Sequence, residues 1–343
     1  MAYSTINKST DNFNTVLYTG NGSLPRAITG VGHQPDFVWL KDRDTAYNHQ
    51  LYDIVRGTSA GVLYSNSTSA EDSAYQLSSF NSDGFTLGSN LGAVNENNKK
   101  IVSWNWKANG AGSANTDGSI NSTVSVNTTA GFSIVKYTGT GSSATVGHGL
   151  GVAPKLIILK TYSATKNWIV GHDSLGWGKN LYLHATDGEN SSSTIWANTS
   201  PTNSVFSVST NNDTNQSGVN IIAYCFAEKT GYNKFGKYTG NGNANGTFVY
   251  TGFKPAFVMV KRTNSSGDWQ LVDNKRLGYN VDNNAIFPNL SNTEDTGDVV
   301  DILSNGFKVR SSTGTWNASS GTYIYMAFGQ SIVGSNNIPA TAR

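Results

Sequence analysis

The amino-acid sequence predicts an all-β fold built from three tandem antiparallel β-sandwich repeats. The first observation is a motif of a proline, one free position, four apolar residues and a lysine, which occurs at residues 35–41, 154–160 and 255–261. Each copy follows a Tyr-Thr-Gly turn, and seventeen residues separate the tyrosine from the proline in all three: Tyr18 to Pro35, Tyr137 to Pro154 and Tyr238 to Pro255. A motif that recurs with fixed internal spacing indicates tandem structural units.

The composition of the 343-residue chain is the second observation. It includes 37 glycines, only 13% of the residues are charged, and asparagine, serine and threonine are abundant. This balance is typical of short strands joined by many polar turns. We find no sustained stretch with apolar residues at the period of an amphipathic helix.

The repeat divides the chain into six expected segments. They are an N-terminal arm (1–12), a first repeat (13–108), a linker rich in Gly, Ser, Asn and Thr (109–131), a second repeat (132–229), a third repeat (230–331) and a polar tail (332–343). We expect the arm to be a disordered tail or a docking segment. Residues 124–126 of the linker could pair as an edge strand, and the near absence of a link between the second and third repeats predicts that these two pack closely.

Each repeat is expected to contain five short strands in the same order. The expected strands are residues 35–41, 50–53, 62–64, 84–87 and 101–107 in the first repeat, 156–159, 168–170, 181–183, 205–208 and 221–227 in the second, and 257–260, 269–272, 285–287, 306–309 and 323–328 in the third. In residues 101–107, Val102, Trp104 and Trp106 fall on one face, a period of two that is typical of a strand with one face on a core. Short strands with Gly/Asn-rich turns favour sandwiches of the jelly-roll or lectin-like type.

Matching positions in the three closing strands predict the core anchors. They are Trp104, Tyr224 and Met326 at one position and Trp106, Phe226 and Phe328 at the next. The motif strand differs because its apolar run is continuous, so both of its faces should be covered. One sandwich covers only one face. We expect the other face to meet a neighbouring repeat, a long loop or another chain, and a homotrimer would supply the last of these.

The conspicuous acidic residues occur in all three repeats: Asp53, Asp173 and Asp273, and Glu71, Glu189 and Glu294. A side chain present in every repeat is more economically a turn former or an acceptor for backbone N–H groups than part of three identical active sites. A glycan-cleaving enzyme would need a pair of carboxylates in one cleft. We therefore predict that the chain is not an enzyme, with a glycan-degrading enzyme as the less favoured alternative.

The histidines and the single cysteine give no sign of a metal or cofactor site. None of the five histidines has the spacing of a metal motif such as His-Glu-x-x-His. They are His33, His49, His148, His172 and His184. Cys225 alone cannot supply a thiolate cluster or an intrachain disulfide. We interpret it as a small packing residue, and we predict no metal and no cofactor.

Four aromatic residues lie in loop-like contexts outside the repeat pattern: Tyr47, Tyr162, Trp177 and Trp196. Loops often carry binding function, and exposed rings on the loops of a β-sandwich can stack on sugar rings. These four residues are the candidate glycan-binding residues of the sequence. The alternative interpretation of each is local packing beneath a long loop.

The charge and hydropathy patterns exclude two classes of partner. The formal net charge is +2, and the lysines and arginines are scattered without a basic run, so we predict no nucleic-acid binding. No run of about 18 apolar residues occurs, so we predict no membrane insertion. One cysteine, and an N-terminus without the apolar core of a signal peptide, predict folding in a reducing cytosol.

The segments that carry the repeat also resemble a family of tailed-bacteriophage virion proteins that is common in marine and cyanobacterial phages. Proteins of this family are often described as tail-fibre or structural proteins. The resemblance extends over nearly the whole chain and is carried by residues 1–9, 28–39, 152–158, 238–242 with 255–261, and 323–328. Its motifs mark the fold rather than a site, so it implies no functional residues.

The resemblance implies a non-enzymatic structural or adhesive protein of the virion, made in the cytoplasm of the host bacterium. We expect a tail fibre or receptor-binding protein that contacts other virion proteins and presents loops to a host surface glycan or protein. A homo-oligomer, such as a trimer, is expected. The alternative is a capsid decoration or head-fibre protein, because the short arm suits docking onto a shell as well as onto a tail.

Overall fold

The structure, a computed structural model, describes residues 5–276 and 283–331. The fold is all-β, as predicted, and the ladders between the named strands of this region are antiparallel. The α-helices of the described residues are single turns: α1 (Ser193–Trp196), α2 (Asn212–Asn215) and α3 (Gly314–Asn317). None of the helices described is long and apolar enough to cross a membrane.

Three inner sheets share one strand order, in which the first strand pairs with the last, the last with the motif strand, and the motif strand with the next along the chain. Unit 1 (residues 13–108) has β1 (Phe13–Thr19), β7 (Lys100–Trp106), β3 (Phe37–Asp42) and β4 (Gln50–Asp53). Unit 2 (132–229) has β10 (Phe132–Thr138), β17 (Asn220–Phe226), β12 (Leu156–Thr161) and β13 (Trp168–His172). Unit 3 (230–331) has β18 (Asn233–Thr239), β24 (Thr322–Ser331), β20 (Phe253–Arg262) and β21 (Gln270–Asp273).

A smaller outer sheet packs over each inner sheet, with a buried apolar cluster between the two. The outer sheets are β2 (Arg26–Thr29), β6 (Gly84–Leu87) and β5 (Leu77–Asn81) in unit 1, β11 (Ala144–Gly147) and β16 (Val205–Val208) in unit 2, and β19 (Phe248–Tyr250), β23 (Gly306–Val309) and β22 (Val300–Leu303) in unit 3. The inner sheet of unit 2 is longer, because β14 (Lys179–Tyr182) and β15 (Asn190–Ser191) extend one end.

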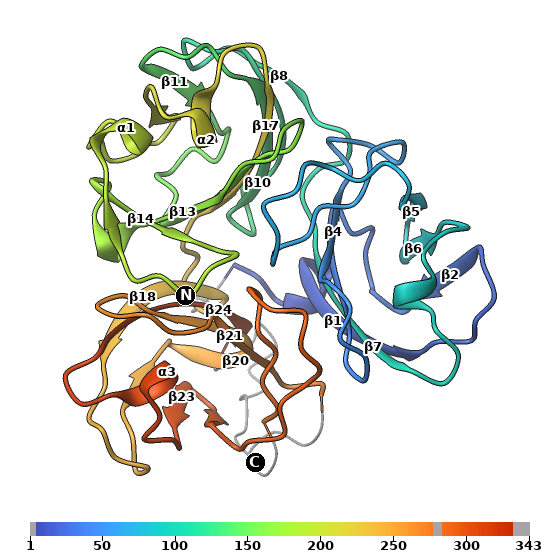
Figure 1. The fold of residues 1–343 in the computed structure, drawn as a ribbon, viewed down its shortest axis with the longest axis vertical. Helices are drawn as coiled ribbons and strands as arrows, with labels where there is room; N and C mark the ends of the chain where they lie inside the picture. Colours follow the sequence, from blue (N-terminus) through green and yellow to red (C-terminus); the bar gives the residue numbers. More distant parts are fainter. Residues whose placement is uncertain (1–4, 277–282, 332–343) are drawn as a thin grey trace.

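The three units lie around a common centre (Figure 1), where their inner sheets share one buried cluster. We call this cluster the central core; its largest rings include Trp104, Trp106, Phe226, Phe257 and Phe328. The aromatic anchors predicted from the closing strands are therefore buried, but they lie between units rather than inside one. Aromatic side chains bury large apolar areas, so this cluster is a major source of stability.

The motif strand divides its side chains between two cores. In β3, Phe37 and Trp39 enter the central core, whereas Val38 and Leu40 face the outer sheet of unit 1. The same alternation holds for β12 and β20. A continuous apolar run is thus explained by burial on both faces. The sequence left open whether a neighbouring repeat, a long loop or another chain covers the second face. In the structure, the neighbouring units of the same chain cover it.

The linker and the arm are more ordered than the sequence predicted. Within residues 109–131, β9 (Ser122–Asn127) pairs with β10, and β8 (Ser113–Asn115) forms the edge beyond it. The expected strand at residues 124–126 is therefore present, but it lies inside the sheet. Ile6 of the arm is only 6% exposed and belongs to the central core. Residues 1–4 of the arm and the predicted tail, 332–343, lie outside the described residues.

Two predicted strands are reduced to isolated bridges. Residues 62–64 contribute Val62 and Leu63, which bridge Asp72 and Leu51, and residues 285–287 form the corresponding bridges in unit 3. Cys225 is buried and free, as expected for a packing residue, and burial raises the pKa of its thiol.

The central core makes a direct prediction about stability. The Trp106 ring contacts all three units, with centroid distances of 4.8 Å to Phe13, 6.5 Å to Phe226 and 5.6 Å to Phe257. Trp106→Ala should lower the free energy of unfolding by about 3–5 kcal/mol, because it leaves a cavity at the centre. Urea denaturation followed by circular dichroism measures this loss. Exposed Val152→Ala should change stability by less than about 0.5 kcal/mol, and a loss below about 1 kcal/mol for Trp106→Ala would contradict the role assigned to the central core.

Candidate functional site

The contacts between neighbouring units, here called seams, repeat in a cycle. A backbone N–H of each unit donates to the carbonyl that lies two residues after the motif lysine of the next unit. The bonds are Glu71 N to Tyr162 O at 2.8 Å, Glu189 N to Thr263 O at 2.7 Å and Glu294 N to Arg43 O at 2.9 Å. The third bond returns from unit 3 to unit 1, so the three units form a closed ring.

A ring N–H crosses each seam in the opposite direction. The bonds are Trp168 Nε1 to Tyr64 O at 2.9 Å, Trp269 Nε1 to Tyr182 O at 2.9 Å and His49 Nε2 to Phe287 O at 3.0 Å. His49 Nδ1 accepts from Trp39 Nε1 at 2.8 Å, which leaves Nε2 to carry the proton. Burial and the Lys41 charge hold the pKa of His49 well below its ordinary value. Neutral His49 therefore donates the ring N–H that a tryptophan indole donates at the other two seams.

The repeated lysines are buried and bind main-chain carbonyls. Lys160 Nζ donates across the seam to Thr68 O at 2.8 Å, and Lys261 Nζ donates to Thr186 O at 2.8 Å. Lys41 instead bonds within its own loop, to Asp42 O and Thr45 O. Burial lowers the pKa of each lysine to about 8. The lysine that ends the motif is thus a framework residue.

Buried aspartates receive donors from the neighbouring closing strand. The Tyr224 hydroxyl donates to Asp53 Oδ2 at 3.0 Å, and Trp104 Nε1 donates to Asp273 Oδ2 at 3.0 Å. Where Met326 offers no donor, His172 occupies the acid's place: the strand registers align Phe37 with Asp53, Leu156 with His172 and Phe257 with Asp273. The sequence predicted that Asp173 matches Asp53 and Asp273. The matching residue is instead His172, and Asp173 follows it by one position.

Arginines join the acids into ion pairs. Arg56 bridges Asp53 (2.6 Å) and Glu71 (2.8 Å) in unit 1. Arg276 similarly bridges Asp273 (2.7 Å) and Glu294 (3.0 Å) in unit 3.

Glu294 also binds Arg43 of unit 1 through two hydrogen bonds of 2.7 and 2.8 Å. Burial alone would raise the pKa of Glu294, but the bonds and charges of Arg43 and Arg276 outweigh it and lower the pKa to about 2. The remaining repeated acids pair on the surface, Asp173 with Lys155 and Glu189 with Lys179. All six acids singled out from the sequence are therefore held in ion pairs.

Two of the four candidate glycan-binding aromatics are packing residues. Trp177 is 5% exposed and Trp196, in α1, is 0% exposed. Their rings meet edge to face, with centroids 5.4 Å apart, and both cover Gly171, where an added Cβ would lie 2.6 Å from Trp177. Neither ring offers a free face to a sugar, and the packing interpretation accounts for both.

The other two candidates lie apart from this pair and from each other. Tyr162 is half-buried at the seam of units 1 and 2, with the Arg56 guanidinium 5.8 Å from its ring centroid. It also lines a hollow of about 430 Å³ with Asn121 and Asn220. Tyr47 is 38% exposed in the loop after β3. The structure therefore does not bring the four predicted residues together into one site.

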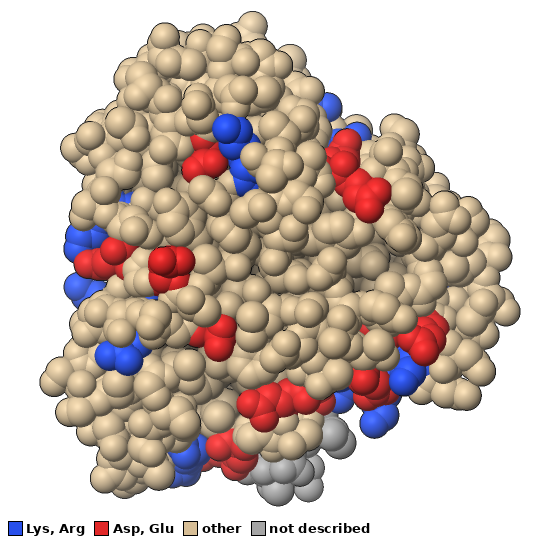
Figure 2. All heavy atoms as spheres, viewed as in Figure 1, with Lys and Arg blue, Asp and Glu red and all other residues tan. Residues whose placement is uncertain are grey.

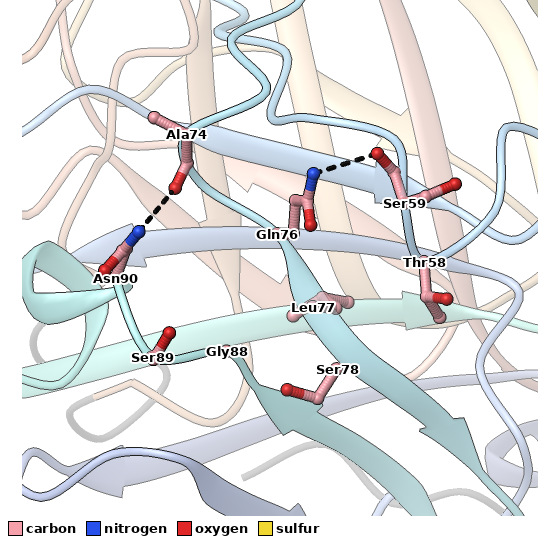
Figure 3. A pocket seen from close by; sticks show the side chains of 9 residues that line it. All are labelled: Thr58, Ser59, Ala74, Gln76, Leu77, Ser78, Gly88, Ser89 and Asn90. Carbon is pink, nitrogen blue, oxygen red and sulfur yellow. Dashed lines mark hydrogen bonds between the residues drawn. The ribbon is translucent and has the colours of Figure 1, made fainter.

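A larger hollow lies at the outer sheet of unit 1. Its volume is about 440 Å³, and hydroxyl and amide groups dominate its lining (Figure 3). Gln76 donates to Ser59 O at 2.9 Å, and Asn90 donates to Ala74 O at 3.1 Å. None of the residues that line it is titratable. The hollow can hydrogen-bond a neutral polar group, but its lining supplies no acid or base.

The most exposed aromatic pair of the described chain, Phe248 and Tyr250 on β19, was not predicted from the sequence. The signal was present as an aromatic, apolar, aromatic alternation, which predicts that both rings share one face. It was hidden because β19 is short and was not among the expected strands.

Charged groups are sparse over the molecule. Figure 2 shows acidic and basic side chains in small scattered groups on the face viewed, without a continuous area of one sign. Among the described residues, no three His, Cys, Asp or Glu side chains are grouped to hold a metal ion.

Comparison with protein-family models places residues 8–331 in one family, described as a domain of unknown function (DUF7483). The chain belongs to this family. The matched span contains all three units and their seams, so family membership applies to the whole ring. Neither the curated proteins nor the solved structures include a significant match to the chain.

The Glu294 network predicts a large effect of removing one charge. Glu294→Gln leaves Arg43 and Arg276 buried beside a neutral amide, so it should lower the free energy of unfolding by about 3 kcal/mol or more. Chemical denaturation at neutral pH measures the difference. The matched control is Glu228→Gln, which removes the half-exposed pair with Lys234 and should cost under about 1 kcal/mol. Equal losses in the two variants would contradict a special role for the seam.

His172 predicts part of the acid sensitivity. Its Nε2 donates to Tyr325 O across the seam of units 2 and 3, while its Nδ1 accepts from Ser174 N. Burial lowers its pKa to about 4. The unfolded chain takes up this proton near pH 6.5 and the folded chain does not, so stability is full above pH 6.5 and falls as the pH drops toward 4, by up to about 3 kcal/mol.

His172→Gln removes this titration and keeps a donor for Tyr325 O. The stability lost between pH 7.5 and 4.5 should be smaller in the variant than in the wild type by roughly 2–3 kcal/mol. Denaturation curves at the two pH values test this. Identical losses in both proteins would show that His172 does not contribute.

Proposed function

We propose that this chain is a non-enzymatic surface protein of a bacteriophage particle, a tail fibre or receptor-binding protein that presents its outer sheets and loops to the host. We also propose that each unit is a β-sandwich repeat. The proposal joins the resemblance carried by the repeated segments to the architecture of the ring. Its location would be the virion, after synthesis in the host cytoplasm.

The observation that carries the proposal is the use of the repeated residues. Lys160, Lys261, the ring N–H donors and the Arg43–Glu294 ion pair join neighbouring units, and the large aromatic rings fill the central core. The outer sheets of this ring face away from the centre (Figure 1). That arrangement suits display of surfaces rather than the motion of parts around a reaction centre.

The alternatives are weighed by the same contacts. A capsid decoration or head-fibre protein was expected as an alternative because the short arm suits docking onto a shell, but Ile6 of that arm packs into the central core. A glycan-degrading enzyme would need two carboxylates free to act in one cleft. Asp53 and Glu71 instead share Arg56.

The uncovered face of the motif strands no longer argues for a homo-oligomer. A homotrimer was expected because the second face of each motif strand needed a cover. The three units cover these faces for one another within one chain. The oligomeric state stays a prediction, and other virion proteins stay the expected partners.

Immunogold electron microscopy of purified particles tests the proposal. Antibodies against the purified chain should label the tail or its fibres on intact particles. Label over the head would favour the decoration protein instead. An antibody against the major capsid protein is the matched control. Strong signal in the soluble lysate with no label on any particle would contradict a virion role.

A further inference from the structure

The outer sheet of unit 3 presents an aromatic pair to solvent. Phe248 is 44% exposed and Tyr250 is 54% exposed, while Val249 between them is buried in the core of unit 3. Alternate residues of a strand point the same way and lie about 7 Å apart. The two rings therefore form a short aromatic row along the edge strand of this sheet.

The fold does not require these rings. Val249 pairs with Phe307 as Ile28 pairs with Phe85 and as Val146 pairs with Phe206. At the flanking positions, unit 1 has Ala27 and Thr29, and unit 2 has Thr145 and Gly147.

Phe248 packs over a glycine of the outer sheet, but the corresponding glycine of unit 1 is not covered by an aromatic ring. Phe248 lies over Gly306, where an added Cβ would come within 3.2 Å of its ring. In unit 1 the corresponding Gly84 pairs with Thr29, beside Ala27. Since the equivalent sheet of unit 1 has alanine and threonine at these positions, the aromatic pair is a feature of unit 3 alone.

The surroundings of the pair are polar and nearly balanced in charge. Lys308 lies opposite Phe248 in the sheet, and Asp301 lies opposite Lys308. Asp301 is further paired with Arg310. A polyanion or a polycation would find no complementary field here, whereas hydroxyl groups can bond to either sign of charge.

We propose that the Phe248–Tyr250 face is a carbohydrate-binding site that takes the neutral sugar rings of an oligosaccharide. The C–H faces of sugars pack on the faces of aromatic rings, which carry partial negative charge. A protein partner fits less well, because a stable protein interface buries about 800 Å² on each side. Two half-exposed rings on a three-residue strand present far less.

This inference rests on the proposed function only for the source of the sugar, the host surface. Saccharide binding by the purified chain is measured separately from the location of the protein on particles. Labelled virions without saccharide binding would defeat the site alone, and saccharide binding without labelled virions would defeat the virion role alone.

The test uses the full chain and three neutral probes: maltohexaose, cellohexaose and chitohexaose. Binding is measured by saturation-transfer NMR and by calorimetric titration. The decisive variant is Phe248→Ala with Tyr250→Thr, which gives unit 3 the residues that unit 1 already has at these positions. The matched control is Val152→Ala, which removes an exposed apolar side chain of unit 2. Thermal unfolding should be unchanged in both variants.

The wild type should bind at least one probe, and the double variant should lose roughly tenfold or more in affinity, because both stacking contacts are gone. Val152→Ala should bind as the wild type does. A wild type that binds none of the probes overturns the proposal, as does a double variant with unchanged affinity. Adhesion to host cells that survives periodate oxidation of their sugars but is lost in the double variant would assign the face to a protein partner, and would also overturn it.

Discussion

The burial of aromatic rings between three inner sheets is the constraint on which the rest of this structure depends. Each motif strand is apolar on both faces, so no unit can shield its own inner sheet. The three sheets solve this together by meeting at one central core. Once they meet, the polar groups at their edges are removed from water and must be paired. The cyclic seam bonds, the buried lysines and the arginine–carboxylate pairs are the consequence of that requirement.

The sequence predicted much of this framework and little of its surface. Strand order, the repeated motif and the burial of Trp104 and Trp106 follow from spacing and period, because these patterns are set by local geometry. The ring N–H at each seam was also within reach, since His49, Trp168 and Trp269 each lie eight residues after a motif lysine. Within residues 109–131 the sequence predicted a strand at 124–126 but neither its place inside the sheet nor β8, because polar segments pair where an open sheet edge is available. The exposure of Phe248 depends on the fold in the same way.

Departures from the threefold pattern separate framework from function. A residue that recurs at all three seams is explained by the ring, as Glu71, Glu189 and Glu294 are through their backbone N–H groups. A residue that breaks the pattern needs a local reason. His172 has such a reason, because the Met326 side chain has no N–H or O–H group from which an aspartate could accept a hydrogen bond. Trp177 and Trp196 have one in their mutual packing over Gly171. Phe248 and Tyr250 have no such reason inside the molecule, and this is why the pair, rather than the tryptophans, supports a binding site.

The three seams also differ in their polar contacts and in the length of chain that connects the units they join. Units 2 and 3 are joined through residues 227–232. Their seam has the repeated hydrogen bonds and those of His172 and Lys261, without a buried ion pair among the contacts described. Units 3 and 1 have no direct covalent link, because all of unit 2 lies between them in the chain. Bringing such distant segments together costs more chain entropy than closing a short connection. This closing seam contains the Arg43–Glu294–Arg276 network and the Trp104–Asp273 hydrogen bond. The buried ion pair between units, Arg43 with Glu294, thus lies where the peptide chain contributes least to holding the ring closed.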